Sequence, residues 1–169
     1  RLDIDKSVNP DVIGTMTNMS EIETGSVDAI YSSHNIEHLY PHEVGTALME
    51  FHRVLAEDGF VMLTCPDLQS VCQLVAEDKL LEPAYTSPAG PIAPIDMLYG
   101  FRPSMAAGNL YMSHRSGFTR KTLIATFQHF GFKSVAGSRR EANFDLFCLA
   151  SKKELAEDEL ITLAKAHFP

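Results

Sequence analysis

The sequence lacks several features that would each point to a particular kind of protein. Its apolar runs, such as residues 60–63, are far shorter than the roughly 18 consecutive apolar residues of a membrane helix. It has no cluster of Lys and Arg, and its formal net charge of −8 argues against binding to a nucleic-acid backbone. No signal-peptide pattern is visible. We therefore expect partners among small molecules or proteins, with no nucleic acid and no membrane.

Cysteines are also few. The three cysteines, Cys65, Cys72 and Cys148, form no C-x-x-C pair, and an odd number cannot close a complete set of disulfides. Because free cysteines are often small buried residues, we expect all three to lie in the core. The pattern fits a reducing compartment, and we predict a cytoplasmic protein.

Two common catalytic signatures are missing as well. The sequence has no G-x-S-x-G turn, and Ser32-Ser33 lacks the flanking glycines that a nucleophile elbow needs. It has no G-x-G-x-x-G fingerprint either, which removes the main sequence argument for a nicotinamide cofactor. The sequence therefore supports neither a serine hydrolase nor an NAD-dependent enzyme.

What the sequence does contain is enough apolar material for one folded domain. It has 169 residues, of which 45% are hydrophobic, and a domain of about 150 residues buries roughly 70% of its unfolded-chain surface. Residues 27–33 and 60–64 are typical of buried strands, and residues 44–55 carry apolar side chains at helical spacing before Asp58-Gly59, which we expect to end the helix. This strand–helix–strand unit predicts parallel pairing with a right-handed crossover.

Two short strands are expected before this unit. Residues 2–5 alternate apolar and acidic side chains, and Val12-Ile13 is a β-branched pair. The link between them contains Pro10 and is shorter than the crossover of about a dozen residues that normally joins parallel strands. The sequence therefore predicts no crossover helix there.

The second half of the chain predicts an insertion, helices and a hairpin. Residues 83–117 are rich in proline and apolar side chains, which indicates an ordered insertion or lid rather than sheet. We expect an α/β domain over residues 1–152 and a C-terminal helix within residues 153–169. The other expected elements are a helix after Asp67, a helix capped by Thr119 and ended by Gly131, and an antiparallel hairpin formed by residues 132–136 and 144–150.

The segment His34-Asn35-Ile36-Glu37-His38 fits the H-x-x-E-H pattern of inverted zinc proteases. Such an enzyme needs both imidazoles on one helical face, with Glu37 activating a metal-bound water. However, His34 directly follows a predicted strand, and Pro41 disfavours helical geometry just before it. A zinc enzyme on His34, Glu37 and His38 is therefore only a third hypothesis, and the preferred prediction has no metal.

A distributed pattern covers most of the chain, from residue 2 to residue 152. It consists of Asp3 or Asp5 at a strand end, Gly14-Thr15-Met16, residues 25–30, residues 34–39, residues 51–60, Ser116-Gly117-Phe118-Thr119 and Gly131-Phe132. Together these segments resemble class I S-adenosylmethionine-dependent methyltransferases of the small-molecule type. The resemblance implies a Rossmann-like α/β sheet, mostly parallel, with an antiparallel C-terminal hairpin.

The resemblance implies S-adenosylmethionine as cofactor and assigns residues to it. Asp3, with Asp5 close behind, matches the carboxylate that accepts both ribose hydroxyls at a strand end. Thr15 stands where the family usually has an acidic residue on the adenine amino group, and Met16 stands where a backbone amide contacts the ring. The Thr15 hydroxyl can accept a hydrogen bond, although without the assistance of a charge.

Ser33 and His34 match the end of the family's fourth strand, beside the sulfonium. Methyl transfer from a sulfonium mainly requires alignment and exclusion of water, and it requires a base only when the acceptor arrives protonated. The candidate bases are His34, His38 and His114, since imidazole titrates near neutrality. The lid at residues 83–117 would cover a small-molecule methyl acceptor.

The resemblance also implies an incomplete site. The family's first strand and its glycine-rich turn, which holds the methionine part of the cofactor, should precede Leu2, and the sequence opens at Arg1. The Leu2 strand is then expected to pair directly with the Val27 strand, or another chain fills the gap. The alternative function is a truncated, non-catalytic remnant that acts as an oligomerisation or binding module, with a homo-oligomer as its expected form.

Overall fold

The computed structural model describes residues 1–168 and contains a four-stranded sheet with the strand order β3-β4-β8-β7. β3 (Val27–Ser33) and β4 (Leu55–Pro66) are parallel. β8 (Asp145–Ser151) runs antiparallel both to β4 and to β7 (Ser134–Arg140). The parallel pair and the C-terminal hairpin expected from the sequence are therefore confirmed, within an α/β fold of Rossmann-like type.

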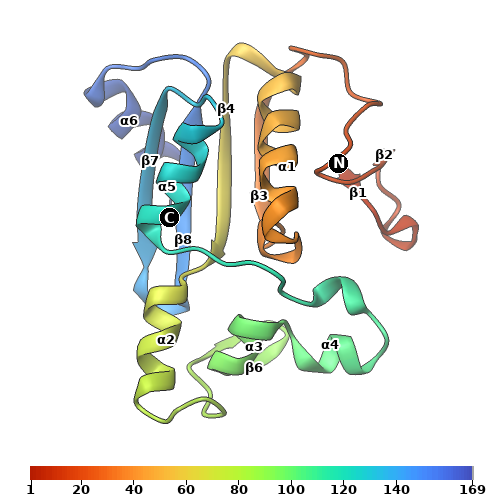
Figure 1. Ribbon diagram of the computed structural model, residues 1–169, viewed down its shortest axis with the longest axis vertical. Helices are drawn as coiled ribbons and strands as arrows, with labels where there is room; N and C mark the ends of the chain where they lie inside the picture. The colour runs from red at the N-terminus through yellow and green to blue at the C-terminus, as the bar shows by residue number, and fades with distance from the viewer. Residues whose placement is uncertain (169) are drawn as a thin grey trace.

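Figure 1 shows two helices, α1 (Pro41–Val54) and α5 (Arg120–His129), on the near face of this sheet. The Thr119 side chain caps α5, and Gly131, with a φ of 95°, follows its end as expected. The expected C-terminal helix is α6 (Glu157–His167), which contacts β7. The domain boundary at residue 152 stays a prediction. α1 carries the apolar stripe that covers the sheet, made of Val44, Ala47, Leu48, Phe51 and Val54.

A separate two-stranded sheet, β1 (Leu2–Asp3) and β2 (Val12–Ile13), lies beside α1 (Figure 1). Its strands are parallel, although the link between them holds only one turn of 3-10 helix, Lys6–Val8. Such a short link suffices because strands of two residues span only about 7 Å. The Leu2 strand does not pair with β3, so direct pairing of the two is not formed within residues 1–168.

The helix expected to end at Asp58-Gly59 ends earlier. α1 stops at Val54, and β4 pairs with β3 at Leu55 and then again from Phe60, which leaves residues 56–59 as a bulge. A Cβ added at position 59 would lie 3.1 Å from a backbone oxygen of β3, a tight contact that glycine avoids. The Asp58-Gly59 pair therefore marks an irregularity in the strand and not a helix end.

Residues 83–117, called the cap below, lie beneath the carboxyl ends of the strands (Figure 1). The expectation that this insertion contains no sheet is wrong, because a short antiparallel hairpin forms around Gly90, whose φ is 116°. The cap packs on α2 (Leu68–Ala76) through a small apolar core of Val71, Ile92 and Met97. Its elements are β5 (Tyr85–Ser87), β6 (Gly90–Ile92), α3 (Pro94–Tyr99), α4 (Arg102–Ala106) and a 3-10 turn at Leu110–Met112.

The cysteines are all free, as expected, but only two are buried. Cys65 lies on β4 and Cys148 on β8, where burial raises the pKa of the Cys148 thiol. The expectation is wrong for Cys72, which is exposed because α2 fully buries only Val71.

Across residues 1–168 no helix combines the length and the apolar character needed to cross a membrane.

Candidate functional site

The carboxyl ends of β3 and β4 are joined by polar contacts. The hydroxyls of Ser33 and Thr64 lie 2.9 Å apart, and the His34 backbone N–H donates to the carbonyl of Thr64 at 2.9 Å. His34 then adopts a φ of 52°, a left-handed conformation that is uncommon for residues other than glycine. Such strain, of about 1–3 kcal/mol, is typical of functional sites, where the surrounding structure holds it.

The turn at His34 leads into a 3-10 helix, Ile36–His38, rather than an α-helix. His34 and His38 therefore do not occupy one face of a helix, and the arrangement of an inverted zinc protease is not formed. The zinc enzyme that uses His34, Glu37 and His38 is thus not supported. Glu37 instead points inward, with only 1% of the residue exposed.

A cavity of about 220 Å³ lies between the strand ends and the cap. This is the position, at the carboxyl ends of parallel strands, where open α/β sheets bind ligands. Its wall from the sheet side consists of His34, Glu37, His38, Pro66, Asn143 and Phe144, and its wall from the cap consists of Tyr85, Ala89, Ile92, Asp96, Met97, Phe101, Met112 and His114.

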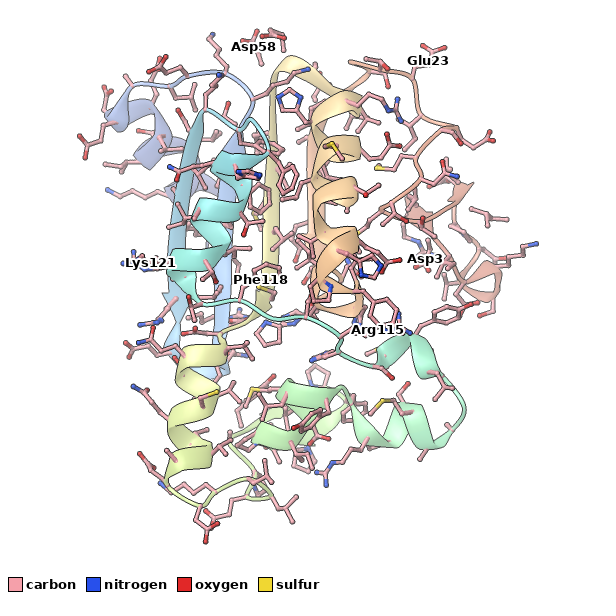
Figure 2. All side chains as sticks on the ribbon, in the orientation of Figure 1. Asp3, Glu23, Asp58, Arg115, Phe118 and Lys121 are labelled. Atoms are coloured by element: carbon pink, nitrogen blue, oxygen red, sulfur yellow. The ribbon has the colours of Figure 1, made fainter. Side chains whose placement is uncertain are left out.

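The cap is fastened to the turn after β3 by the segment that leaves it. The backbone carbonyl of Glu37 accepts hydrogen bonds from the N–H groups of Arg115 and Ser116, at 2.8 and 3.1 Å. The Arg115 guanidinium donates to the carbonyl of His38 at 3.0 Å and lies over the Tyr40 ring, 4.9 Å from its centroid. Figure 2 shows Arg115 where this segment passes the lower end of α1. These contacts bring cap residues to the strand ends.

His34 lies between two buried carboxylates. Its Nδ1 is 3.3 Å from Oε1 of Glu37, and its Nε2 is 3.7 Å from Oδ2 of Asp145. Burial alone would lower the pKa of His34, but the two carboxylates outweigh it and raise this pKa to about 9. Burial would also raise the pKa of Asp145, yet His34 and Arg140 hold it below its usual value. His34 is therefore an imidazolium at neutral pH.

We expect His34 to titrate near pH 9 in the folded protein, against 6.5 for an unperturbed imidazole. Because the pKa is raised on folding, its ion pairs stabilise the protein fully below pH 6.5, and this contribution is lost as the pH rises through about 9. A proton NMR titration of the His34 ring measures this pKa. Asp145→Asn should lower it, and a ring that titrates near 6.5 in both proteins would contradict the assignment.

His38 and His114 face each other across the cavity wall. Their ring centroids are 4.9 Å apart in an edge-to-face arrangement. Nδ1 of His38 lies 3.1 Å from the carbonyl of Ser113, and Nδ1 of His114 lies 2.8 Å from the carbonyl of Met97. Burial lowers the pKa of His114, so its ring is neutral near pH 7. The structure thus brings the three candidate histidines to one cavity.

The residues expected to hold the cofactor divide into two groups. Ser33 and His34 stand at the strand ends, and the sulfur of Met16 lies 3.8 Å from the Ser32 hydroxyl beside them. The others make local contacts: Asp3 accepts from the N–H of Asp5, Asp5 accepts from the N–H of Ser7, and the Thr15 and Thr17 hydroxyls lie 2.9 Å apart. Their roles toward a cofactor stay predictions.

Two acidic residues of the site were not among the predicted site residues. Glu37 had a signal in the H-x-x-E-H pattern, where it was considered only as part of a zinc enzyme. Asp145 had none, because it opens a strand far along the chain and reaches His34 only through the β4–β8 pairing. A second cavity, of about 380 Å³, lies between α1 and residues 17–20, where Arg53 and Glu50 pair at 2.7 Å, and its lining includes no histidine.

Residues 4–63 match the family model described as methyltransferase domain. A comparison with curated protein sequences found no match. The solved structures similar to this chain include a S-adenosylmethionine-dependent methyltransferase from Methanosarcina mazei, at 14% identity and a TM-score of 0.56, covering 91% of this chain and 81% of that protein.

Two further structures have the same fold. A Burkholderia thailandensis 1,6-didemethyltoxoflavin-N1-methyltransferase, solved with its substrate and S-adenosylhomocysteine, is 14% identical with a TM-score of 0.56, covering 90% of this chain and 60% of that one. A S-adenosylmethionine-dependent methyltransferase from Thermotoga maritima is 13% identical with a TM-score of 0.53, covering 83% and 62%. The chain thus spans less than two thirds of these two proteins.

The fold is therefore that of the Rossmann-like methyltransferases, with a cavity at the strand ends. The match of residues 4–63 to the methyltransferase domain model agrees with the expected relation to class I S-adenosylmethionine-dependent methyltransferases.

Proposed function

We propose that this chain is the methyltransferase domain of an enzyme that transfers a methyl group from S-adenosylmethionine to a small molecule. The observation that carries the proposal is the cavity at the carboxyl ends of the parallel pair β3 and β4, closed from below by the cap, in a methyltransferase fold. A volume of about 220 Å³ fits a small acceptor better than a macromolecular one.

The residues proposed to hold S-adenosylmethionine are those at the strand ends and on the N-terminal strands. Ser33 and His34 would lie beside the reacting end of the cofactor, while Asp3 or Asp5 would accept the ribose hydroxyls, and Thr15 and Met16 would contact the adenine. The 3.8 Å contact between Met16 and Ser32 supports this, since it joins the two groups into one surface. The cofactor, when bound, supplies the sulfonium methyl group.

The chain's own contribution to catalysis is alignment of the acceptor and exclusion of water. The cap covers the cavity, and the apolar side chains of Ile92, Met97 and Phe101 form part of its lining. His34 is charged at neutral pH and cannot accept a proton. We therefore assign it to orienting the acceptor rather than to proton abstraction. His38 and His114 stay as the candidates that activate the acceptor. A cytoplasmic location suits the free thiols of the chain.

Calorimetric titration with S-adenosylhomocysteine tests cofactor binding. We expect saturable heat at one site per chain, and we expect Asp3→Ala to weaken binding about 10–100-fold, because charge-assisted hydrogen bonds to the ribose are lost. Glu21→Ala, which removes the same charge from an exposed position, is the matched control and should bind as the unchanged protein does. Absence of heat at millimolar ligand would contradict the proposal.

One observation favours the alternative, an oligomerisation or binding module. β3 is an edge strand of its sheet, and Tyr31 on it is 67% exposed. Edge strands with exposed apolar side chains promote association. Light scattering tests this: a dimer that Tyr31→Lys converts to a monomer would support the module, whereas a monomer at all concentrations would exclude it.

A further inference from the structure

Three side chains with metal-ligand atoms converge on the wall of the cavity. They are Glu37, His38 and His114, and their candidate ligand atoms all lie within 4.8 Å of one another. Glu37 and His38 belong to the turn after β3, whereas His114 belongs to the cap. We propose that these three side chains bind a divalent transition-metal ion, which joins the cap to the strand ends.

Both imidazoles have the hydrogen bonds of metal-bound histidines. Nδ1 of His38 lies 3.1 Å from the carbonyl oxygen of Ser113, and Nδ1 of His114 lies 2.8 Å from that of Met97. Because a carbonyl oxygen only accepts, each Nδ1 carries the proton and each Nε2 keeps its lone pair. Metal-bound histidines almost always donate the other ring N–H to a carbonyl or carboxylate in this way, which fixes the ring orientation.

The Glu37 carboxylate provides a second, independent observation. It is buried, and neither of its oxygens accepts a hydrogen bond from any group in residues 1–168. His34 lies within ion-pair distance, 3.3 Å, but without the geometry of a hydrogen bond. The His34 imidazolium offsets part of the cost of burying this charge, but the carboxylate oxygens still accept no hydrogen bond. A metal ion held between Glu37 and the two imidazoles would satisfy these oxygens.

The donor set selects the kind of ion. Two imidazoles and one carboxylate suit zinc, iron or cobalt better than calcium or magnesium, which take oxygen ligands. Tetrahedral coordination with bonds of about 2.1 Å requires ligand atoms about 3.4 Å apart. The candidate ligand atoms lie within 4.8 Å of one another, so they would approach by up to about 1.4 Å on metal binding, through small shifts of the half-buried His38 and His114 side chains that keep their Nδ1 hydrogen bonds. Both ring nitrogens of His34 face carboxylates, so His34 stays outside the site.

Three protein ligands leave a fourth position open toward the cavity, as in catalytic metal sites. One consequence rests on the proposed function: the open position would bind an oxygen of the methyl acceptor and favour its deprotonation. We therefore infer a hydroxyl-bearing small molecule as the acceptor class. Metal binding itself does not depend on this consequence.

The test uses tag-free protein treated with a chelator and then titrated with Zn²⁺ and with Co²⁺. We expect one ion per chain by calorimetry, and a rise in Tm of about 5–10 °C at a Zn²⁺ concentration 100-fold above Kd. Glu37→Gln and His114→Ala should each weaken binding at least about 100-fold, because losing a ligand costs more than losing its supporting contact. His129→Ala, which removes an exposed histidine of α5, is the matched control.

Glu37→Gln also gives a readout without metal. Because the amide cannot pair with the charged His34, Glu37→Gln should lower the Tm of the metal-free protein by a few degrees and abolish the rise caused by Zn²⁺. Equal Zn²⁺ affinity in the unchanged protein, Glu37→Gln and His114→Ala, or no binding at all, would overturn the site. Zn²⁺ binding without S-adenosylhomocysteine binding would overturn the proposed function and leave the metal site standing, and the converse would overturn the metal site alone.

Discussion

Gly100→Ala is expected to lower the free energy of unfolding by at least about 3 kcal/mol, chiefly by disrupting the cap. Gly100 has a φ of 103° and a ψ of 158°, a region that essentially only glycine occupies. A Cβ there would lie 2.0 Å from the carbonyl oxygen of Met112 and 2.9 Å from its carbonyl carbon, and backbone cannot rotate away as a side chain can. The 3-10 turn that carries Met112 would have to move, and His114 would move with it.

Gly108→Ala is the matched control for this substitution. Gly108 is also in the cap and also has a positive φ, 96°, but no atom lies within 4 Å of an added Cβ. Gly108→Ala should therefore lower the free energy of unfolding only by the cost of a positive φ in alanine, about 1–2 kcal/mol. Urea unfolding and limited proteolysis of the cap measure both effects. Equal stabilities of the two variants would contradict the close approach of Gly100 to Met112.

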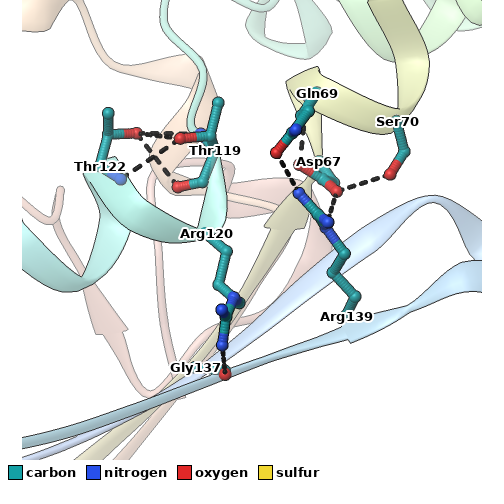
Figure 3. Close-up of polar contacts among 8 residues, drawn as sticks. All are labelled: Asp67, Gln69, Ser70, Thr119, Arg120, Thr122, Gly137 and Arg139. Carbon is teal, nitrogen blue, oxygen red and sulfur yellow. Dashed lines mark hydrogen bonds and ion pairs between the residues drawn. The ribbon is translucent and has the colours of Figure 1, made fainter. Parts of the chain in front are cut away.

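Asp67→Ala should lower the free energy of unfolding by about 3 kcal/mol. Figure 3 shows the Asp67 carboxylate where β4 ends and α2 begins. It accepts from the N–H of Gln69 at 3.2 Å, from the Ser70 hydroxyl at 2.7 Å and from Arg139 Nε at 2.5 Å. Alanine removes the helix cap and leaves the Arg139 guanidinium, which also contacts Gln69, without its carboxylate. Only 1% of Asp67 is exposed, so water cannot replace these bonds.

Asp67→Asn distinguishes the contribution of N-terminal capping of α2 from that of the ion pair with Arg139. The amide oxygen can still cap α2, which preserves about 1 kcal/mol, whereas the ion pair with Arg139 is lost. We expect its stability to fall between those of the unchanged protein and Asp67→Ala. Thermal and urea unfolding of the three proteins measure the order of their stabilities. If Asp67→Ala were as stable as the unchanged protein, the link from β4 to α2 would not depend on this carboxylate.

Segments governed by local periodicity were predictable from the sequence. The stripe from Val44 to Leu55 defined α1, and the apolar runs at residues 27–33 and 60–64 defined the parallel pair. Thr119 and Gly131 marked the ends of α5 because capping depends on a few neighbouring residues. These signals are local, so a single sequence carries them.

Contacts between distant segments were not predictable. The hairpin inside the cap, the bulge at residues 56–59 and the ion pair of His34 with Asp145 depend on how the chain packs over long separations. The three candidate histidines do meet at one cavity, but the sequence had no signal that His114 would face His38 across it. The buried, donor-free state of Glu37 is likewise a property of the folded chain alone.

A crystal structure with S-adenosylhomocysteine at saturating concentration would show where this protein binds its cofactor. We expect electron density for the ligand along the carboxyl ends of β3 and β4, with its sulfur beside Ser33 and His34 and its ribose at Asp3 or Asp5. The cavity under the cap should stay free for the acceptor. Density at another place on the molecule, or no density at saturation, would show that the strand ends are not a cofactor site.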